Sequence, residues 1–169
     1  MRRFLDWLYA AAEFLAAVSL IGVLLTVLLS IVSRQLTFHV SGLDAYAGYL
    51  MASAGFFALA STLRHGEHIR VTILLNVLSP QGKRRLDIGA IIVGLAVAVS
   101  LAFFSSKLVL DSWMFNDIST SNDATPLWIP QLSMAVGNIL FVIAFIDLLV
   151  ARIRGQELLI DLQEPQRNE

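Results

Sequence analysis

Four long stretches without a charged residue divide this sequence. They cover residues 14–33, 45–63, 88–106 and 124–146. An α-helix rises about 1.5 Å per residue, so about 20 residues are enough to cross a hydrocarbon core roughly 30 Å thick. All four stretches qualify as membrane-spanning helices. We therefore expect an all-α integral membrane protein whose membrane domain, residues 14–150, contains four transmembrane helices.

The composition favours the same class. Of the 169 residues, 57% are hydrophobic and only 15% are charged, which is more apolar surface than a soluble domain of this length can bury. The 12 Lys and Arg residues against 13 Asp and Glu residues give no basic excess that would point to nucleic acid. The absence of cysteine excludes disulfides and cysteine-ligated zinc, haem or iron–sulfur sites.

The apolar run Val71–Leu78 lies between the second and third stretches and is too short to cross. Only 12 uncharged residues separate Arg70 from Lys83, and Pro80 breaks the helix before they end. On a helical wheel the apolar side chains cover most of the circumference and leave a narrow polar face. We expect residues 69–78 to form an interfacial helix in the plane of the cytoplasmic leaflet, with a plain connector as the alternative.

The distribution of Lys and Arg predicts the orientation in the membrane. Ten of the 12 lie before the first span, between the second and third, or after the fourth, whereas only Arg34 and Lys107 lie on the other side. Because basic residues are retained in the cytoplasm during insertion, both termini are predicted to be cytoplasmic.

The two ends of the chain flank the membrane domain. Residues 1–13 read as an amphipathic lead-in with Trp7 and Tyr9 at the headgroup level. The apolar stretch that follows is longer than the core of a signal peptide, and Asp6 and Glu13 interrupt the approach to it, so we expect a retained span. Residues 151–169 are expected to form a cytoplasmic tail.

The spans lack the residues that membrane enzymes and proton pumps use. None of the four stretches contains Asp, Glu, Lys, Arg or His, although such groups mark most intramembrane reaction paths. His65 and His68 have a spacing that a metal site tolerates, but no third ligand is evident. We predict that the chain is not an enzyme and binds no cofactor or metal. At the span edges, Asp44 and Asp147 either reach water or form interhelical pairs.

Small residues recur along two spans. Ala90, Gly94, Ala98 and Ala102 follow one another every four residues on the third span, and Gly48 with Ala52 begins a weaker row on the second. In lipid, helices associate mainly through close packing, so rows of small residues mark helix contact faces. Contact with another span of this chain is the default expectation, and contact with a partner protein is the alternative.

Taken together, the connections resemble the small membrane subunit of TRAP transporters, the tripartite ATP-independent periplasmic carriers of the DctQ-like family. The resemblance covers about residues 5–150 and rests on four segments: SRQLTF with Arg34, GLDAYAGYL with Asp44, GFFALASTLRHGEHIRV with Arg64, Gly66 and His68, and IPQLSMAVG with Pro130 and Gly137. The sequence departs from the family pattern at Gln35, where a Tyr is usual, and at Asp44, where Glu is common.

The resemblance implies a non-catalytic scaffold. In such systems a soluble periplasmic protein captures an organic acid and delivers it to a large membrane subunit, which performs sodium-coupled transport. The small subunit would anchor the large one in the membrane and would touch the binding protein transiently. The residues expected at the interface with the large subunit or with lipid are Arg34, Asp44, Arg64, Gly66, His68, Ile73, Val77, Gly94, Ala98 and Pro130.

Two other functions are weighed against this one. A small self-contained transporter needs a carboxylate buried in the membrane, and Glu13 and Asp44 are marginal for that role. A membrane anchor of an oxidoreductase needs buried cofactor ligands such as paired histidines, which the spans lack. The sequence does not identify the transported acid, since its recognition would lie in the other two components.

Overall fold

The computed structural model describes residues 2–36, 38, 40–64, 80–121 and 123–154. These residues form the four helices α1 (Arg2–Gln35), α2 (Leu43–Arg64), α4 (Pro80–Met114) and α5 (Trp128–Ile153). The described residues contain no named strand, only one isolated β-bridge between Ile118 and Pro126. Each helix is long and apolar enough to cross a membrane, so the expected all-α class with four such helices is confirmed. The interfacial helix expected at residues 69–78 lies outside the described residues.

The helices extend well beyond the uncharged stretches. Residues 2–13 belong to the same continuous helix as the first span, and α4 begins at Pro80 and continues past Lys107 to Met114. Only the hydrocarbon core requires uncharged residues, whereas Lys, Arg and Glu are good helix formers in the flanking turns. Pro80 therefore opens α4, where its missing N–H would have had no partner in any case.

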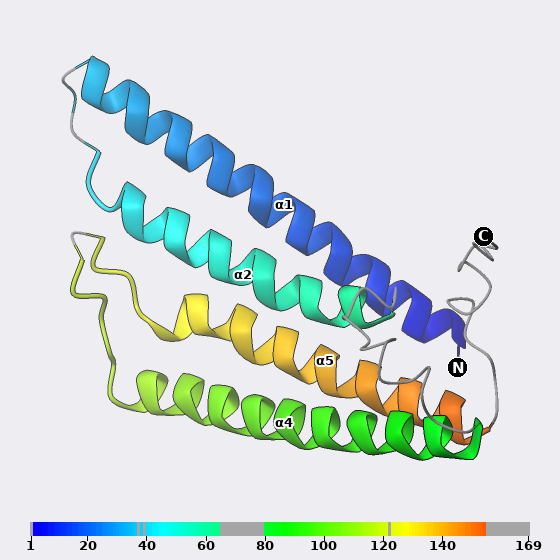
Figure 1. Ribbon diagram of the computed structural model, residues 1–169. Coiled ribbons are helices and arrows are strands. Elements are labelled where there is room, and N and C mark those ends of the chain that lie inside the picture. Colours follow the sequence, from blue (N-terminus) through cyan, green and yellow to red (C-terminus); the bar gives the residue numbers. More distant parts are fainter. Residues whose placement is uncertain (1, 37, 39, 65–79, 122, 155–169) are drawn as a thin grey trace, which may run out of the picture.

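The four helices stand side by side in one row, in the order α1, α2, α5, α4 (Figure 1). Helices joined by the short loops 36–42 and 115–127 run antiparallel. Both loops consequently lie at one end of the row, which we call the loop end, and the N-terminus and the end of α5 lie at the other, the terminal end. This order makes α2 and α5 the inner helices and leaves α1 and α4 at the two edges.

The apolar core lies toward the terminal end. Its buried members come from all four helices: Tyr9, Ala60, Leu63, Ile91, Ala98, Phe141, Ala144 and Phe145. The rings of Phe141 and Phe145 meet edge to face with centroids 4.8 Å apart. Tyr9, which the sequence places beside Trp7 at the headgroup level, is 2% exposed and packs against protein, while Trp7 is 68% exposed.

Burial is highest in α5 and lower in the other three helices. Within the most apolar window of α5, 39% of the residues are buried inside the protein, compared with 11% in α1 and 17% in both α2 and α4. A single row gives an edge helix only one neighbour, so most of its circumference stays uncovered. The apolar side chains on these uncovered surfaces must therefore face lipid or another membrane protein.

Candidate functional site

At the loop end, Tyr49 of α2 joins the connection between α4 and α5. Its hydroxyl lies 2.9 Å from Ser119 Oγ and 3.1 Å from Asp123 Oδ2, and it shares its proton between them. Ser119 donates a hydrogen bond of 2.7 Å to the other oxygen of Asp123. One turn earlier on α2, the Tyr46 hydroxyl is hydrogen-bonded to Thr125 at 3.3 Å. These bonds fix the 115–127 loop against the first turns of α2.

Gly42 brings the two loops into direct contact. Its backbone has φ +82°, a region that favours glycine, and a Cβ at this position would lie 2.6 Å from the Cβ of Asp123. Any other residue would be strained and would push Asp123 away from Tyr49. Described residues of both connections therefore form one continuous surface at the loop end.

The hydrogen bonds also act on the ionisation of Asp123. Desolvation is the largest single influence and raises the pKa of its carboxyl group. Hydrogen bonds from Thr125, Ser119, the backbone of Asp123 and Tyr49 outweigh it together, so the net pKa lies below the ordinary value of 3.8. The carboxylate is thus ionised at neutral pH, which is the state that its donors require.

We expect Asp123→Asn to lower thermal stability at neutral pH by an amount that disappears in acid. Because the folded-state pKa is lowered, the stabilisation by the ionised carboxylate is present above pH 3.8 and is lost as the pH falls through the folded-state value. Melting curves of the wild type and Asp123→Asn between pH 3 and pH 7 test this. A difference in melting temperature that stays constant down to pH 3 would contradict it.

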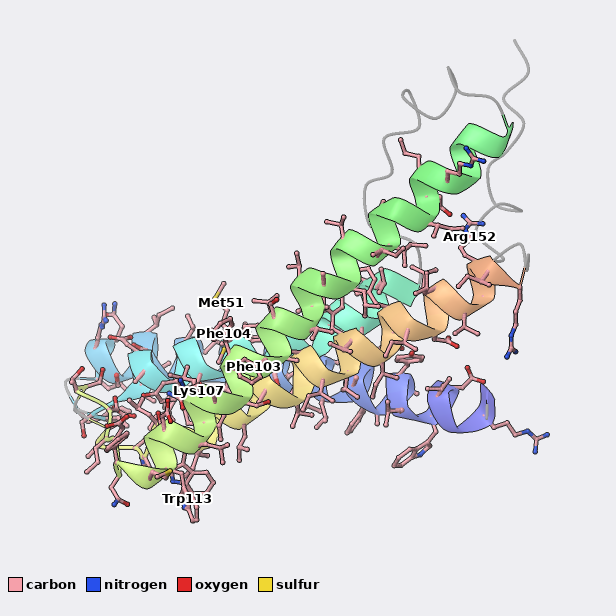
Figure 2. The ribbon with its side chains drawn as sticks, turned by 90° about the horizontal axis from the view of Figure 1, so that it is seen from below. Met51, Phe103, Phe104, Lys107, Trp113 and Arg152 are labelled. Carbon is pink, nitrogen blue, oxygen red and sulfur yellow. The ribbon has the colours of Figure 1, made fainter. Side chains whose placement is uncertain are left out.

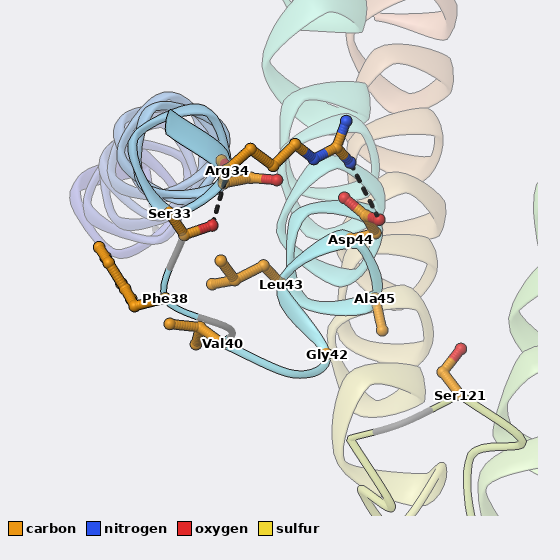
Figure 3. Close-up of a pocket in the computed structure, with 10 residues that line it drawn as sticks. Ser33, Arg34, Phe38, Val40, Gly42, Leu43, Asp44, Ala45 and Ser121 are labelled. Carbon is orange, nitrogen blue, oxygen red and sulfur yellow. Dashed lines mark hydrogen bonds and ion pairs between the residues drawn. The ribbon is translucent and has the colours of Figure 1, made fainter. Parts of the chain in front are cut away.

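A cleft of about 500 Å³ opens at the loop end between α1 and α2 (Figure 3). Ser33 and Arg34 of α1 line it from one side, and Gly42, Asp44 and Ser121 line it from the other. Arg34 Nη2 lies 3.9 Å from Asp44 Oδ2, and the two side chains are 75% and 87% exposed. An ion pair this exposed contributes little to stability. Breaking it would cost little, so Arg34 and Asp44 could each bind a charged group of another molecule instead.

At the terminal end, α4 and α5 are joined by an ion pair between Asp87 and Arg152. The carboxylate accepts a hydrogen bond from Arg152 Nε, and the two side chains are only 22% and 18% exposed. On the other side of the row, Ser61 of α2 donates a hydrogen bond of 2.7 Å to Glu13 of α1. Each of these contacts fixes a neighbouring pair of helices near its end.

In a comparison with protein-family models, residues 23–155 match the DctQ component of the tripartite ATP-independent periplasmic transporters. The matched region begins inside α1 and ends just after α5, so it includes the loop end and most of the four-helix row. The chain belongs to the DctQ family. A comparison with curated protein sequences gave no match. Membership makes the chain the small membrane component of a TRAP transporter, as the four segments quoted above suggest.

Some of the interface residues expected from the DctQ resemblance make contacts within this chain. Ala98 is fully buried, and a Cβ on Gly94 would lie 2.6 Å from the ring of Phe145, so both contact α5. Pro130 lies in the first turn of α5, where its carbonyl accepts a hydrogen bond from Ser133 at 2.7 Å. As contacts with a partner subunit, these positions stay predictions.

Other expected residues lie elsewhere. Arg34 and Asp44 come together at the cleft, as described above. Arg64 ends α2, whereas Gly66, His68, Ile73 and Val77 lie outside the described residues. In the described ranges no three His, Cys, Asp or Glu side chains gather as metal ligands would.

Sequence reasoning missed several polar contacts of this DctQ protein. Tyr49 with Asp123 and Asp87 with Arg152 join residues more than 60 positions apart, so no local spacing predicts them. The same is true of Ser53, which donates a hydrogen bond of 2.8 Å to Ser133 across the α2–α5 contact. One signal was available: Tyr46 and Tyr49 stand in adjacent turns at the loop end of α2, where hydroxyls find partners.

Proposed function

We propose that this chain is the non-catalytic scaffold subunit of a sodium-coupled TRAP transporter for an organic acid. In this role it anchors the large transport subunit in the bacterial inner membrane, and a periplasmic binding protein touches the complex transiently from the loop end. The observation that carries the proposal is the open row of helices. An arrangement that leaves most of α1 and α4 uncovered offers wide apolar surfaces to a second membrane protein.

The alternative of a self-contained transporter has less support. Glu13 is exposed in the first half of α1, Asp44 is exposed in the first turn of α2, and the less exposed carboxylate of Asp87 is paired with Arg152. The alternative of an oxidoreductase membrane anchor is not supported, because the DctQ family to which this chain belongs is a component of transporters.

Uptake into liposomes tests the division of labour. We expect the purified chain alone to give no sodium-dependent uptake of organic acid, the large subunit alone to give uptake at background level, and the two together with the binding protein to give substrate-specific uptake. Sodium-dependent uptake by this chain alone would favour the self-contained transporter. Full uptake by the large subunit and binding protein without this chain would remove the scaffold role.

Cytoplasmic termini are part of the proposal and can be tested with single cysteines, since the chain has none of its own. We expect Ser41→Cys and Thr120→Cys at the loop end to react with an impermeant maleimide added to spheroplasts, and Gln166→Cys to react only after lysis. Ser41 is preferred to Gly42 as a reporter, because the positive φ of Gly42 does not tolerate a side chain. Labelling of Gln166→Cys in intact spheroplasts would show that the C-terminus lies outside and that the predicted orientation is wrong.

The interfacial helix at residues 69–78 also remains part of the proposal. Its apolar side chains, Ile73 and Val77 among them, would grip the large subunit or the adjacent lipid at the cytoplasmic surface. The basic residues that open α4, Lys83, Arg84 and Arg85, would add attraction to an anionic lipid surface of about 1 kcal/mol each.

A further inference from the structure

A groove runs along one face of the row where α5 lies between α2 and α4. It has a volume of about 450 Å³, and its residues are Phe56 of α2, Met134 and Asn138 of α5, and Leu101, Phe104, Ser105, Lys107, Leu108 and Asp111 of α4. Figure 2 shows Phe104 and Lys107 along α4. Since α5 contacts both α2 and α4, the groove lies between these two helices over α5, and it is lined mainly by apolar side chains.

The groove contains a buried polar group with an unmet bond. Asn138 is 1% exposed, and its Nδ2 donates a hydrogen bond of 3.2 Å to Ser105 Oγ. Its Oδ1 is buried and accepts no hydrogen bond from the part of the chain that the structure describes. Turning the amide over does not help, since Ser105 already donates its proton to the carbonyl of Leu101 at 2.7 Å.

The depth of Asn138 restricts what can supply the missing donor. It lies ten residues after Trp128, the first residue of α5, which places it about 15 Å along a helix that crosses a core of roughly 30 Å. The hydrogen-bond donors of a lipid are at its headgroup, so an acyl chain in the groove would leave Asn138 Oδ1 unmet near the middle of the bilayer. A side-chain hydroxyl or amide on a protein helix can reach this depth.

The α2 wall beside the groove is shaped for close contact between helices. Gly48, Ala52 and Phe56 follow one another at four-residue spacing, and the first two are exposed. A Cβ added to Gly48 or to Gly55 would meet no atom within 4 Å, so no part of the described chain covers this ridge. Small residues allow a second helix to approach closely, and this row leads directly to Phe56 in the groove.

We propose that this groove seats one transmembrane helix of the large subunit and that this helix donates a hydrogen bond to Asn138 Oδ1. The proposal rests on the scaffold function above and adds the contact face, its depth and the group that recognises the partner. The terminal torsion of an Asn side chain is broad, so its oxygen can turn toward a donor that enters the groove. Lys107 also lines the groove, so its aliphatic part would lie along the seated helix.

Site-specific photocrosslinking in the assembled transporter tests the face. We expect Leu101→p-benzoylphenylalanine, in the groove, to crosslink to the co-expressed large subunit on irradiation. Val99→p-benzoylphenylalanine is the matched control: it lies two residues away on a different face of α4, and the exposures of Leu101 and Val99 are similar, 44% and 49%. An adduct with phospholipid alone, or with a second copy of this chain, would overturn the proposal.

The same experiment separates this proposal from the scaffold function. If the large subunit copurifies with both variants but neither crosslinks to it, the groove proposal fails and the scaffold function stands. If the wild-type chain does not retain the large subunit at all, the scaffold function fails.

Asn138→Leu tests the hydrogen bond separately from folding. In the isolated chain this change removes the hydrogen bond to Ser105 and also removes the cost of an unmet buried acceptor, so we expect the two effects to offset and the melting temperature to stay nearly unchanged. In the complex a bond is lost, so the affinity for the large subunit should fall by about threefold, the factor of a typical hydrogen bond between membrane helices. Unchanged affinity would remove the recognition role, and an isolated chain that melts lower would make Asn138 an internal structural residue.

Discussion

Gly137→Ala is expected to destabilise the protein more than Gly94→Ala or Gly89→Ala. A Cβ at Gly137 of α5 would lie 2.6 Å from the carbonyl oxygen of Phe56 and 2.7 Å from its carbonyl carbon. Both atoms belong to the backbone of α2, so no side chain can move aside and the two inner helices must separate. Overpacking of this kind costs about 3 kcal/mol, which corresponds to a fall of roughly 10 °C in melting temperature.

Thermal unfolding of the purified protein in detergent is the measurement, with Gly89→Ala as the control. Gly89 lies on an exposed face of α4, and a Cβ there meets no atom within 4 Å, so this change should leave the melting temperature unchanged or raise it slightly. Gly94→Ala should fall between the two, because its neighbour is the ring of Phe145, which can shift. Equal melting temperatures for Gly137→Ala and Gly89→Ala would show that α2 and α5 do not approach this closely.

Arg152→Glu is expected to have the second large effect. It would place two carboxylates together where Asp87 and Arg152 now pair at about 20% exposure, and an unpaired charge in such a site costs roughly 3 kcal/mol or more. The double variant Asp87→Arg, Arg152→Glu restores opposite charges and should recover most of the lost stability. The measurement is again the melting temperature of the isolated chain, so it needs no partner subunit.

The matched control for this pair is at the other end of the row. Arg34→Glu breaks the ion pair with Asp44, whose side chains are 75% and 87% exposed, and should cost less than about 1 kcal/mol. If Arg34→Glu and Arg152→Glu have equal effects on melting temperature, burial does not decide the strength of these pairs. If the charge-swapped double variant melts as low as Arg152→Glu alone, the contact between α4 and α5 at the terminal end is not the one described.

The four apolar helices that the structure describes were predictable from the sequence. An uncharged stretch of about 20 residues has few alternatives, because bilayer thickness sets its length and a helix satisfies its own backbone hydrogen bonds. The helix ends were less predictable. Pro80 and Lys83 look like the end of a membrane segment, yet they open α4, because charged turns outside the hydrocarbon core continue a helix readily.

The candidate site was predictable only in part. Arg34 and Asp44 are joined by a short loop, so their proximity follows from the antiparallel turn between α1 and α2. The small-residue row on the third span is a contact face at Gly94 and Ala98, whereas Ala90 is exposed, and spacing does not distinguish an inner partner from an outer one. The contact with Phe145 shows that Gly94 faces α5. The open space around Gly48 and Gly55 shows that the weaker row on α2 is uncovered within the described chain.

Sequence alone indicates four helices that are long and apolar enough to cross a membrane and, through the segments around Arg34, Arg64 and Pro130, a resemblance to the small TRAP subunit. These properties are local, because hydropathy and short motifs are contained within single segments. The helix order α1, α2, α5, α4 is visible only in the folded structure. The same holds for the contact of Asp87 with Arg152 and for the burial of Asn138 beside an open groove. These properties depend on contacts between segments far apart in the sequence, and in lipid the packing of side chains decides them, since apolar surface alone gives one helix no preference for another.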